Sequence, residues 1–189
     1  MKKNIVLLIA VLFSCCITAQ EQTLYATKNQ QLTWIGKAAV GSYAPEGTLK
    51  VSKASLSLEN ETVTQMEITV NMKSLQQENK QLTKHLKEED FFYVSKYPEA
   101  TFKLTETAKI EEGTITLKGI MTIRGISKEE IIEAKILNEK NTITLQFSTI
   151  LDRTDYGVNH NSPSIFTRLK ENAIADEFSL QGRITFTTN

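Results

Sequence analysis

Apolar and polar residues alternate along most of this chain with a period of two. The clearest runs are residues 66–72, 115–123, 143–147 and 178–186. Such a period turns one face of a β-strand toward a core and the other toward water. Threonine is frequent in these runs, which suits pleated and half-buried strands. The pattern therefore predicts a protein built mainly from strands with one buried face.

Shorter segments with strand character fill the intervals between these runs. They are residues 33–41, 48–58, 101–110 and 131–137, and turn signals stand at 45–47, 59–61, 112–113 and 138–141. Closely spaced strands joined by tight turns predict an all-β sandwich or barrel. No internal repeat or linker divides the chain, so we expect one domain.

Two glycines interrupt otherwise regular strands. Gly119 and Gly182 stand at positions of the apolar parity. A strand glycine often marks a bulge or a bend at a barrel corner, or it is simply a small residue that the strand tolerates. The sequence leaves these alternatives open.

One segment has helical rather than strand spacing. Leu82 and Leu86 lie four residues apart within residues 79–87, which predicts a short helix with both leucines facing inward. An aromatic-rich connection over residues 90–98 follows it. A cluster of that size should not stay exposed, so it covers the core or forms the mouth of a pocket.

The first residues have the order of a secretory signal. Two lysines precede the apolar run 5–13, and small and polar residues end at Ala19. We expect a signal peptide over residues 1–19, a mature domain over 20–189, and a periplasmic or secreted location. Cys15 and Cys16 both lie in this leader, so a lipoprotein anchored at Cys15 is a second interpretation, which Phe13 fits badly.

Charge and motifs exclude several classes of function. Lys and Arg number 22, as do Asp and Glu, so no basic excess indicates nucleic-acid binding. The two histidines, His85 and His160, form no HExxH pair, and no P-loop, GxSxG or GxGxxG motif occurs. His85 is expected to pack or cap its helix. These observations predict a protein without an active site, and we expect no metal or cofactor.

Six stretches together resemble the YceI-like family. They are NMKSL at 71–75, HLKEEDFF at 85–92, KYPEATF at 96–102, GIMTIRG at 119–125, DRTDYG at 152–157 and IADEF at 174–178. They follow the family's order and extend over most of the chain from Trp34 onward. Two features differ from the family: residues 41–47 lack the histidine that many members have in this turn, and Met121 replaces a leucine.

The resemblance implies an antiparallel eight-stranded lipocalin-like barrel, with the short helix and the aromatic-rich loop over it. It also implies a long isoprenoid lipid inside, either a quinone or a polyisoprenoid phosphate, which the protein sequesters or transports. Transient membrane contact and a homodimer are compatible with this interpretation. The alternative is a ligand-free, filled barrel that acts as a periplasmic interaction or stress-response protein, because a barrel of eight strands suits either state.

The residues expected to contact the lipid share large apolar side chains or polar groups within the family-like stretches. They are Trp34, Met72, Phe91, Phe92, Tyr97, Phe102, Met121, Ile123, Arg124, Phe147, Asp152 and Arg153. The polar members either contact the lipid head group or form salt bridges at the barrel rim.

Overall fold

The structure of the protein is a computed structural model that describes residues 21–166 and 172–187. The expected signal peptide, with Cys15 and Cys16, lies outside these residues. The strands are β1 (Gln22–Ala26), β2 (Gln31–Ile35), β3 (Glu46–Glu59), β4 (Thr62–Gln77), β5 (Glu99–Leu104), β6 (Ala108–Lys109), β7 (Thr114–Ile123), β8 (Ile126–Glu139), β9 (Thr142–Asp152) and β10 (Glu177–Thr187). The helices are α1 (Lys80–Lys87) and the 3₁₀ turn η1 (Arg153–Tyr156).

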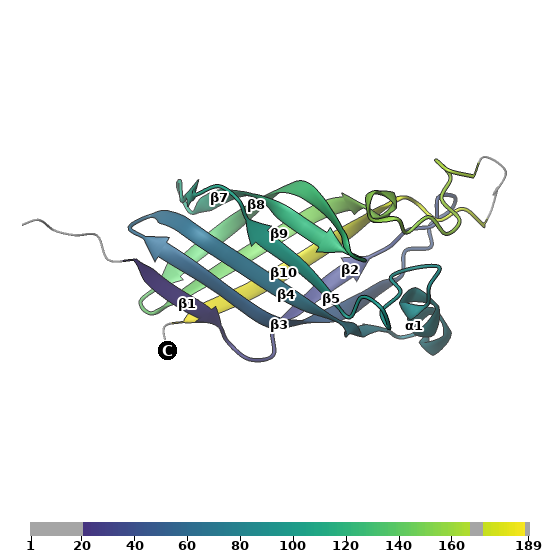
Figure 1. Ribbon diagram of the computed structural model, residues 1–189, viewed down its shortest axis with the longest axis horizontal. Helices are drawn as coiled ribbons and strands as arrows, with labels where there is room; N and C mark the ends of the chain where they lie inside the picture. The colour runs from purple at the N-terminus through teal and green to yellow at the C-terminus, as the bar shows by residue number, and fades with distance from the viewer. Residues whose placement is uncertain (1–20, 167–171, 188–189) are drawn as a thin grey trace, which may run out of the picture.

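The strands close into one antiparallel barrel (Figure 1). β1 and β2 share one position, because both pair with β3 on one side and with β10 on the other. β5 and β6 likewise share a position beside β4. The described strands therefore occupy eight positions around the ring, and the pairing of β3 with β4 closes it. The predicted eight-stranded all-β barrel is confirmed.

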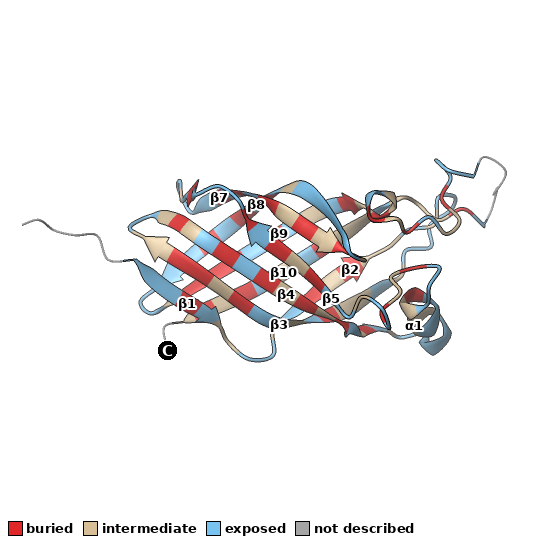
Figure 2. Ribbon diagram, viewed as in Figure 1, coloured by how far each residue is buried: buried red, intermediate tan, exposed pale blue. Residues whose placement is uncertain are grey.

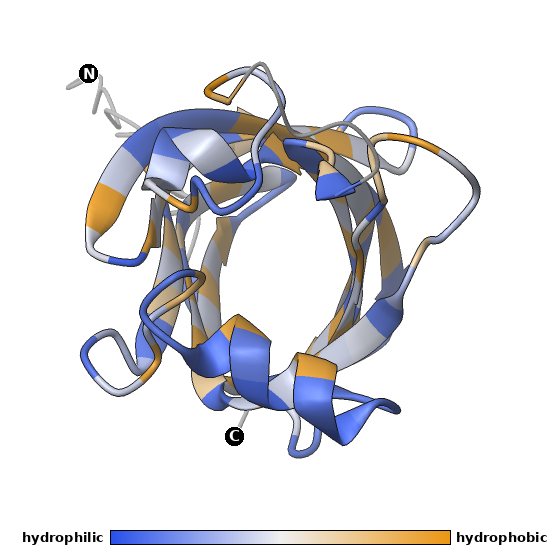
Figure 3. Cartoon of the chain, turned by 90° about the vertical axis from the view of Figure 1, so that its right-hand side faces the viewer, coloured by the Kyte–Doolittle hydropathy of each residue, from blue (hydrophilic) through white to orange (hydrophobic). Residues whose placement is uncertain are grey.

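Burial follows the alternation of the sequence. In β7 the inward residues from Ile115 to Ile123 are buried, and most of their neighbours are exposed or half-buried (Figure 2). Seen from the end that carries α1, the strands form a ring around the interior (Figure 3). Closure leaves no free sheet edge along the paired strands, and one shared interior receives all the inward side chains.

Several predicted strand limits were wrong. The segment predicted at 33–41 ends as a strand at Ile35, and the chain then folds back, with Gly36 N–H donating to Pro45 O and Ala38 N–H to Tyr43 O. The predicted turn at 45–47 is also displaced, because β3 already begins at Glu46. Local hydrogen bonds between the two arms of this loop replace the ladder that a continued β2 would need.

Other limits differ because the alternation fades where the barrel wall is exposed. β8 starts five residues before the predicted 131, in a stretch exposed on both faces except for half-buried Glu130. β1 was not predicted, and Leu24 is its one buried residue. The segment predicted at 101–110 is two strands, β5 and β6, separated by an exposed linker.

The strand glycines make room for aromatic rings. A Cβ atom on Gly182 would lie 2.5 Å from Leu32 Cδ2 and 2.6 Å from the ring of Phe147, and one on Gly119 would lie 2.6 Å from the ring of Phe102. The strand pairing runs without a register shift through both glycines. Neither glycine marks a bulge. Each allows a neighbouring ring to lie flat against the wall.

α1 lies at one end of the barrel, opposite the end where β1 begins and β10 finishes (Figure 1). Asn79 caps it by accepting from the backbone N–H groups of Gln81 and Leu82. Leu86 is buried and Leu82 is partly buried against the core, which confirms the predicted helix and its inward face. None of the helical segments in the described part of the chain has the length and apolar character needed to cross a membrane.

A buried arginine fastens the segment between β9 and β10 to this same end. Arg153 is 5% exposed, and its guanidinium donates to the carbonyl oxygens of Ala175 (3.0 Å), Val158 (2.6 Å) and Ile174 (2.9 Å). Its Nη2 also lies 3.5 Å from Asp176 Oδ1. Burial lowers the pKa of Arg153, and the charge of Asp176 opposes that effect. The planar fork of an arginine suits such divergent acceptors.

We expect Gly182→Ala to destabilise the protein by about 1–3 kcal/mol, the usual cost of overpacking a core, because its methyl group displaces the ring of Phe147. Urea unfolding measures the change. Gly36→Ala is the matched control, since its Cβ atom would meet no atom closer than 3.8 Å. A Gly182→Ala protein as stable as the control would contradict the close packing of this ring.

We expect Arg153→Lys to lose at least about 2 kcal/mol of unfolding free energy, although it keeps the charge. A lysine cannot serve the three carbonyl oxygens together, and each orphaned buried acceptor costs about 1–3 kcal/mol. Arg183→Lys, at an exposed position of β10, is the control. Equal unfolding midpoints for the two variants would show that the carbonyl contacts of Arg153 contribute little.

Candidate functional site

The barrel encloses a cavity of about 320 Å³ in the half nearest α1. Its lining is almost entirely apolar. The inward residues of the strands that line it are Leu32, Trp34, Leu49, Ile68, Val70, Met72, Leu75, Ala100, Phe102, Leu117, Met121, Ile123, Ile132, Leu145, Phe147, Phe178 and Leu180. Alternating strand positions thus supply the wall, and the cavity can accept an apolar molecule or chain.

The opposite half of the barrel is filled by its own side chains. Leu117 and Leu145 line the cavity, whereas Ile115 and Ile143, two residues away on the same strands, are buried outside the lining. The cavity therefore ends between these levels. The residues that pack beyond it include Leu56, Val63, Ile184 and Phe186, all at most 1% exposed. The barrel is hollow at one end and closed at the other.

The helix and the end loops form the rim of the cavity. Leu82 and Leu86 of α1 line it, as do Phe91 and Phe92 from the connection that follows. The aromatic-rich loop is thus part of the pocket wall, and Phe91 also packs in the core. Tyr43 lines the cavity and is 62% exposed, so the cavity reaches the surface beside this residue.

One donor in the lining has no partner within the described chain. Trp34 is 8% exposed, and its Nε1–H forms no hydrogen bond to any described residue. A Cβ atom on Gly47 of β3 would collide with its indole, so the ring is held against the wall. An unpaired buried N–H costs free energy, and a bound acceptor oxygen would recover it.

Nine of the twelve residues predicted to contact a ligand line the cavity. They are Trp34, Met72, Phe91, Phe92, Phe102, Met121, Ile123, Phe147 and Arg153. Arg153 lies at the rim of the cavity, but its guanidinium is already bonded to backbone carbonyl oxygens and to Asp176. Rim salt bridging is therefore the interpretation of Arg153 that its contacts support.

The other three predicted residues lie outside the lining. Tyr97 packs its ring over Gly125 and against Tyr93, at 6.0 Å between ring centroids. Asp152 ends β9 and accepts hydrogen bonds from the backbone N–H and the hydroxyl of Thr154, so its carboxylate has local partners at the end of the strand.

Arg124 occupies the turn between β7 and β8. Its backbone φ is 53°, and Gly125 follows with φ 72°, so the two residues form the tight turn of this hairpin. Its side chain donates to the carbonyl oxygens of Gly157 (2.7 Å) and Glu89 (2.9 Å). Like Arg153, it ties together the end segments, but unlike Arg153 it is not part of the cavity lining.

The lining also contains loop residues that the sequence analysis did not single out. They are Gly36, Lys37, Ala38, Tyr43, Pro45, Asn172, Ala173, Ile174 and Ala175, and Glu177 at the start of β10 also lines the cavity. No periodicity marks them, because loop residues reach the cavity only through the fold of the end segments. Strand parity could have identified Leu32, Ile68 and Val70, which share a face with predicted members.

Similar proteins include two bacterial relatives with 30% identity or more over part of the chain. A UPF0312 protein of Ectopseudomonas mendocina (strain ymp) is 32% identical over 87 residues, which is 46% of each chain. Protein YceI of Salmonella newport (strain SL254) is 30% identical over 80 residues, 42% of this chain and 41% of that protein. The matched segments thus span less than half the length of these relatives.

Two solved structures share the fold. BcnA of Burkholderia cenocepacia has a TM-score of 0.69 and 18% identity, over 82% of this chain and 95% of that chain. A polyisoprenoid binding domain from Saccharophagus degradans, implicated in plant cell wall breakdown, has a TM-score of 0.65 and 9% identity, over 89% of this chain and 100% of that domain.

One protein family matches almost the whole of the described barrel. The model of the YceI-like domain matches residues 25–186, from the end of β1 into the last residues of β10. The resemblance drawn from the sequence motifs is confirmed, and this chain belongs to the YceI-like family.

Proposed function

We propose that this protein binds a long apolar lipid in the hollow half of its barrel and carries out no chemistry on it. The observation that carries the proposal is the apolar cavity of about 320 Å³ that opens beside Tyr43. Pockets for drug-sized ligands commonly measure about 300–1,000 Å³, and this cavity is at the lower end of that range. It therefore encloses a segment of a long lipid rather than all of it. The rest of the lipid would extend out of the barrel through the opening beside Tyr43.

An isoprenoid is the lipid class that we propose, either a quinone or a polyisoprenoid phosphate. The similarly folded domain from Saccharophagus degradans, which is described as binding polyisoprenoid, supports this class. Met72 and Met121 line the cavity, and their flexible thioethers adapt to a branched chain. The hollow interior does not fit the alternative of a filled barrel that acts only as an interaction protein.

Apolar burial by itself gives this protein little selectivity. Each methylene taken from water contributes about 0.8 kcal/mol, but a lipid that comes from a membrane is already out of water. Shape and polar contacts must therefore discriminate between lipids. The unpaired Nε1–H of Trp34 favours a lipid with an acceptor oxygen close to its buried part, as a quinone carbonyl provides.

Two of the titratable groups with shifted pKa values, Tyr156 and Asp176, have structural partners. Burial, together with a 2.6 Å hydrogen bond to Glu130, raises the pKa of Tyr156 far above its usual value. Burial favours a higher pKa for Asp176, but hydrogen bonds from Ser162 and Ser164 and the charge of Arg153 outweigh it and lower this pKa. Neither group lines the cavity, and both hold the end segments together.

We further propose that the protein works in the periplasm or outside the cell, where it sequesters or transports its lipid. The order of charged, apolar and small residues over 1–19 supports this location. Anchoring through Cys15 is the alternative. In either case the protein meets its lipid at a membrane surface.

Native mass spectrometry of protein purified without detergent tests the proposal. We expect one lipid of isoprenoid mass per chain. Ala100→Phe should reduce the bound fraction at least about tenfold, because the new ring enters the cavity beside Val70 and takes the place of a ligand.

Ile131→Phe is the matched control, since it adds the same ring at a position of β8 that is 61% exposed. It should retain the lipid. A bare polypeptide mass, even after quinones and isoprenoid phosphates have been offered, would contradict lipid binding. Equal retention by the two variants would place the lipid outside this cavity.

The proposed role of Trp34 predicts a selective loss in Trp34→Phe. Affinity for a quinone should fall about fivefold, which corresponds to about 1 kcal/mol for one neutral hydrogen bond. Affinity for an isoprenoid hydrocarbon without oxygen should stay unchanged. Displacement of a fluorescent lipid probe measures both, and an equal loss for the two ligands would show that the indole contributes shape alone.

A further inference from the structure

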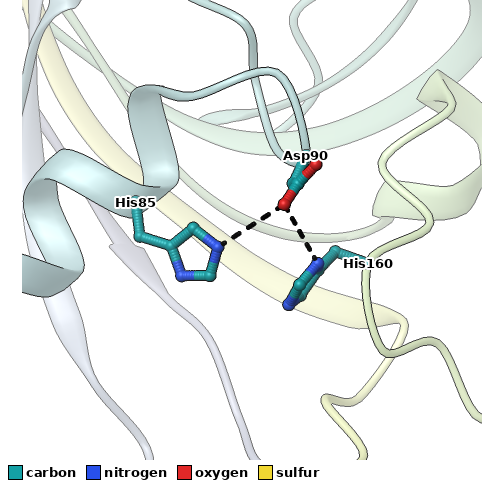
Figure 4. Close-up of side chains that lie close together, drawn as sticks. All are labelled: His85, Asp90 and His160. Carbon is teal, nitrogen blue, oxygen red and sulfur yellow. Dashed lines mark ion pairs between the residues drawn. The ribbon is translucent and has the colours of Figure 1, made fainter.

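Both histidines of the chain lie together at the end of the barrel that carries α1 (Figure 4). His85 projects from α1, Asp90 from the connection after it, and His160 from the segment between η1 and β10. The two imidazole rings are 75 positions apart in the sequence, yet their centroids are 5.0 Å apart. Asp90 Oδ2 lies 4.0 Å from His85 Nε2 and 3.7 Å from His160 Nδ1.

We propose that His85, Asp90 and His160 form a binding site for a zinc ion, with a fourth position open to water or to another ligand. One potential ligand atom from each residue lies within 4.8 Å of the other two. Zinc bonds of about 2.0–2.1 Å in a tetrahedral site place ligand atoms about 3.3–3.4 Å apart. His85 and Asp90 are exposed, so rotation of their side chains can close the difference.

The ligand types favour a transition metal over magnesium or calcium. Two imidazoles and one carboxylate suit Zn²⁺, whereas Mg²⁺ and Ca²⁺ prefer oxygen ligands. Three protein ligands with one open position are the usual arrangement of zinc sites that take an exogenous ligand. Beside His160 and Asp90 is a surface hollow from which that ligand would come. It is lined also by Glu89, Arg124, Gly157, Asn159, Asn161 and Phe166.

The two histidines of the cluster pack against Phe91. Phe91 packs its ring edge-on against His85 at 4.9 Å and lies 5.0 Å from the ring of His160. Phe91 itself lines the cavity. An ion here would connect the segment that follows α1 with the segment that follows η1, directly outside the wall of the lipid cavity. The site itself needs no lipid and stands independently of the proposed function.

Zinc titration followed by ¹⁵N NMR of the histidine rings tests the site. The protein should be untagged, free of lipid, and carry Cys15→Ser and Cys16→Ser so that thiolates do not compete. We expect both rings to shift together and to saturate at one Zn²⁺ per chain. Mg²⁺ at the same concentration should leave them unmoved. Unshifted rings, or the same shifts with Mg²⁺, would overturn the proposal.

Variants then identify the ligands by calorimetry. His85→Ala, His160→Ala and Asp90→Asn should each weaken zinc binding more than about tenfold, the lower end of what even outer-shell substitutions cost. Glu106→Gln, which changes an exposed carboxylate 3.3 Å from Lys118 Nζ, should bind as tightly as the unaltered chain. Circular dichroism establishes that each variant is folded. A folded His160→Ala protein with unchanged affinity would exclude this cluster as the site.

Discussion

The width of an eight-stranded barrel constrains everything that this protein can hold. Such an interior is just large enough to be filled by side chains or to accept one ligand, so the volume of each inward residue decides between the two states. At one end Leu56, Ile184 and Phe186 fill the space. At the other end, glycines allow the rings of Phe102 and Phe147 to lie against the wall, and the interior stays open. The proposed lipid binding depends on this uneven filling.

Two arginine side chains bind the loops at the open end. Arg153 and Arg124 both donate to backbone carbonyl oxygens of segments distant in sequence. Loops at a barrel end have no strand ladder to satisfy their carbonyl groups, and buried acceptors without a donor are costly. Two arginines supply donors where the ladder stops. These bonds connect the end segments at the same end of the barrel where Phe91 lines the cavity.

The proposed lipid site and the proposed zinc site lie next to each other at the rim, although neither needs the other to be occupied. Phe91 is part of the cavity wall on one side and contacts both imidazoles on the other. A change in the packing of Phe91 therefore alters both the lipid cavity and the histidine cluster. The lipid depends on apolar volume, whereas the ion depends on nitrogen and oxygen ligands at the surface.

The sequence by itself determined the all-β class, the inward face of most strands, the short helix with Leu82 and Leu86 inside, and the family. These features are local. Period-two alternation and helical spacing can be recognised within a few residues, and each family motif is a short run of consecutive residues. It did not determine the early end of β2, the exposed start of β8 or strand β1, where few residues are buried and no alternation marks the wall.

Only the tertiary structure decided whether the barrel is hollow, and which loop residues line it. Gly182 lies opposite Phe147 of the neighbouring strand and leaves room for its ring, in a register set by the whole sheet. His85 and His160 likewise meet only after the segments around α1 and η1 have folded onto the same rim. Contacts between distant segments depend on closure of the ring, which no local pattern of residues encodes.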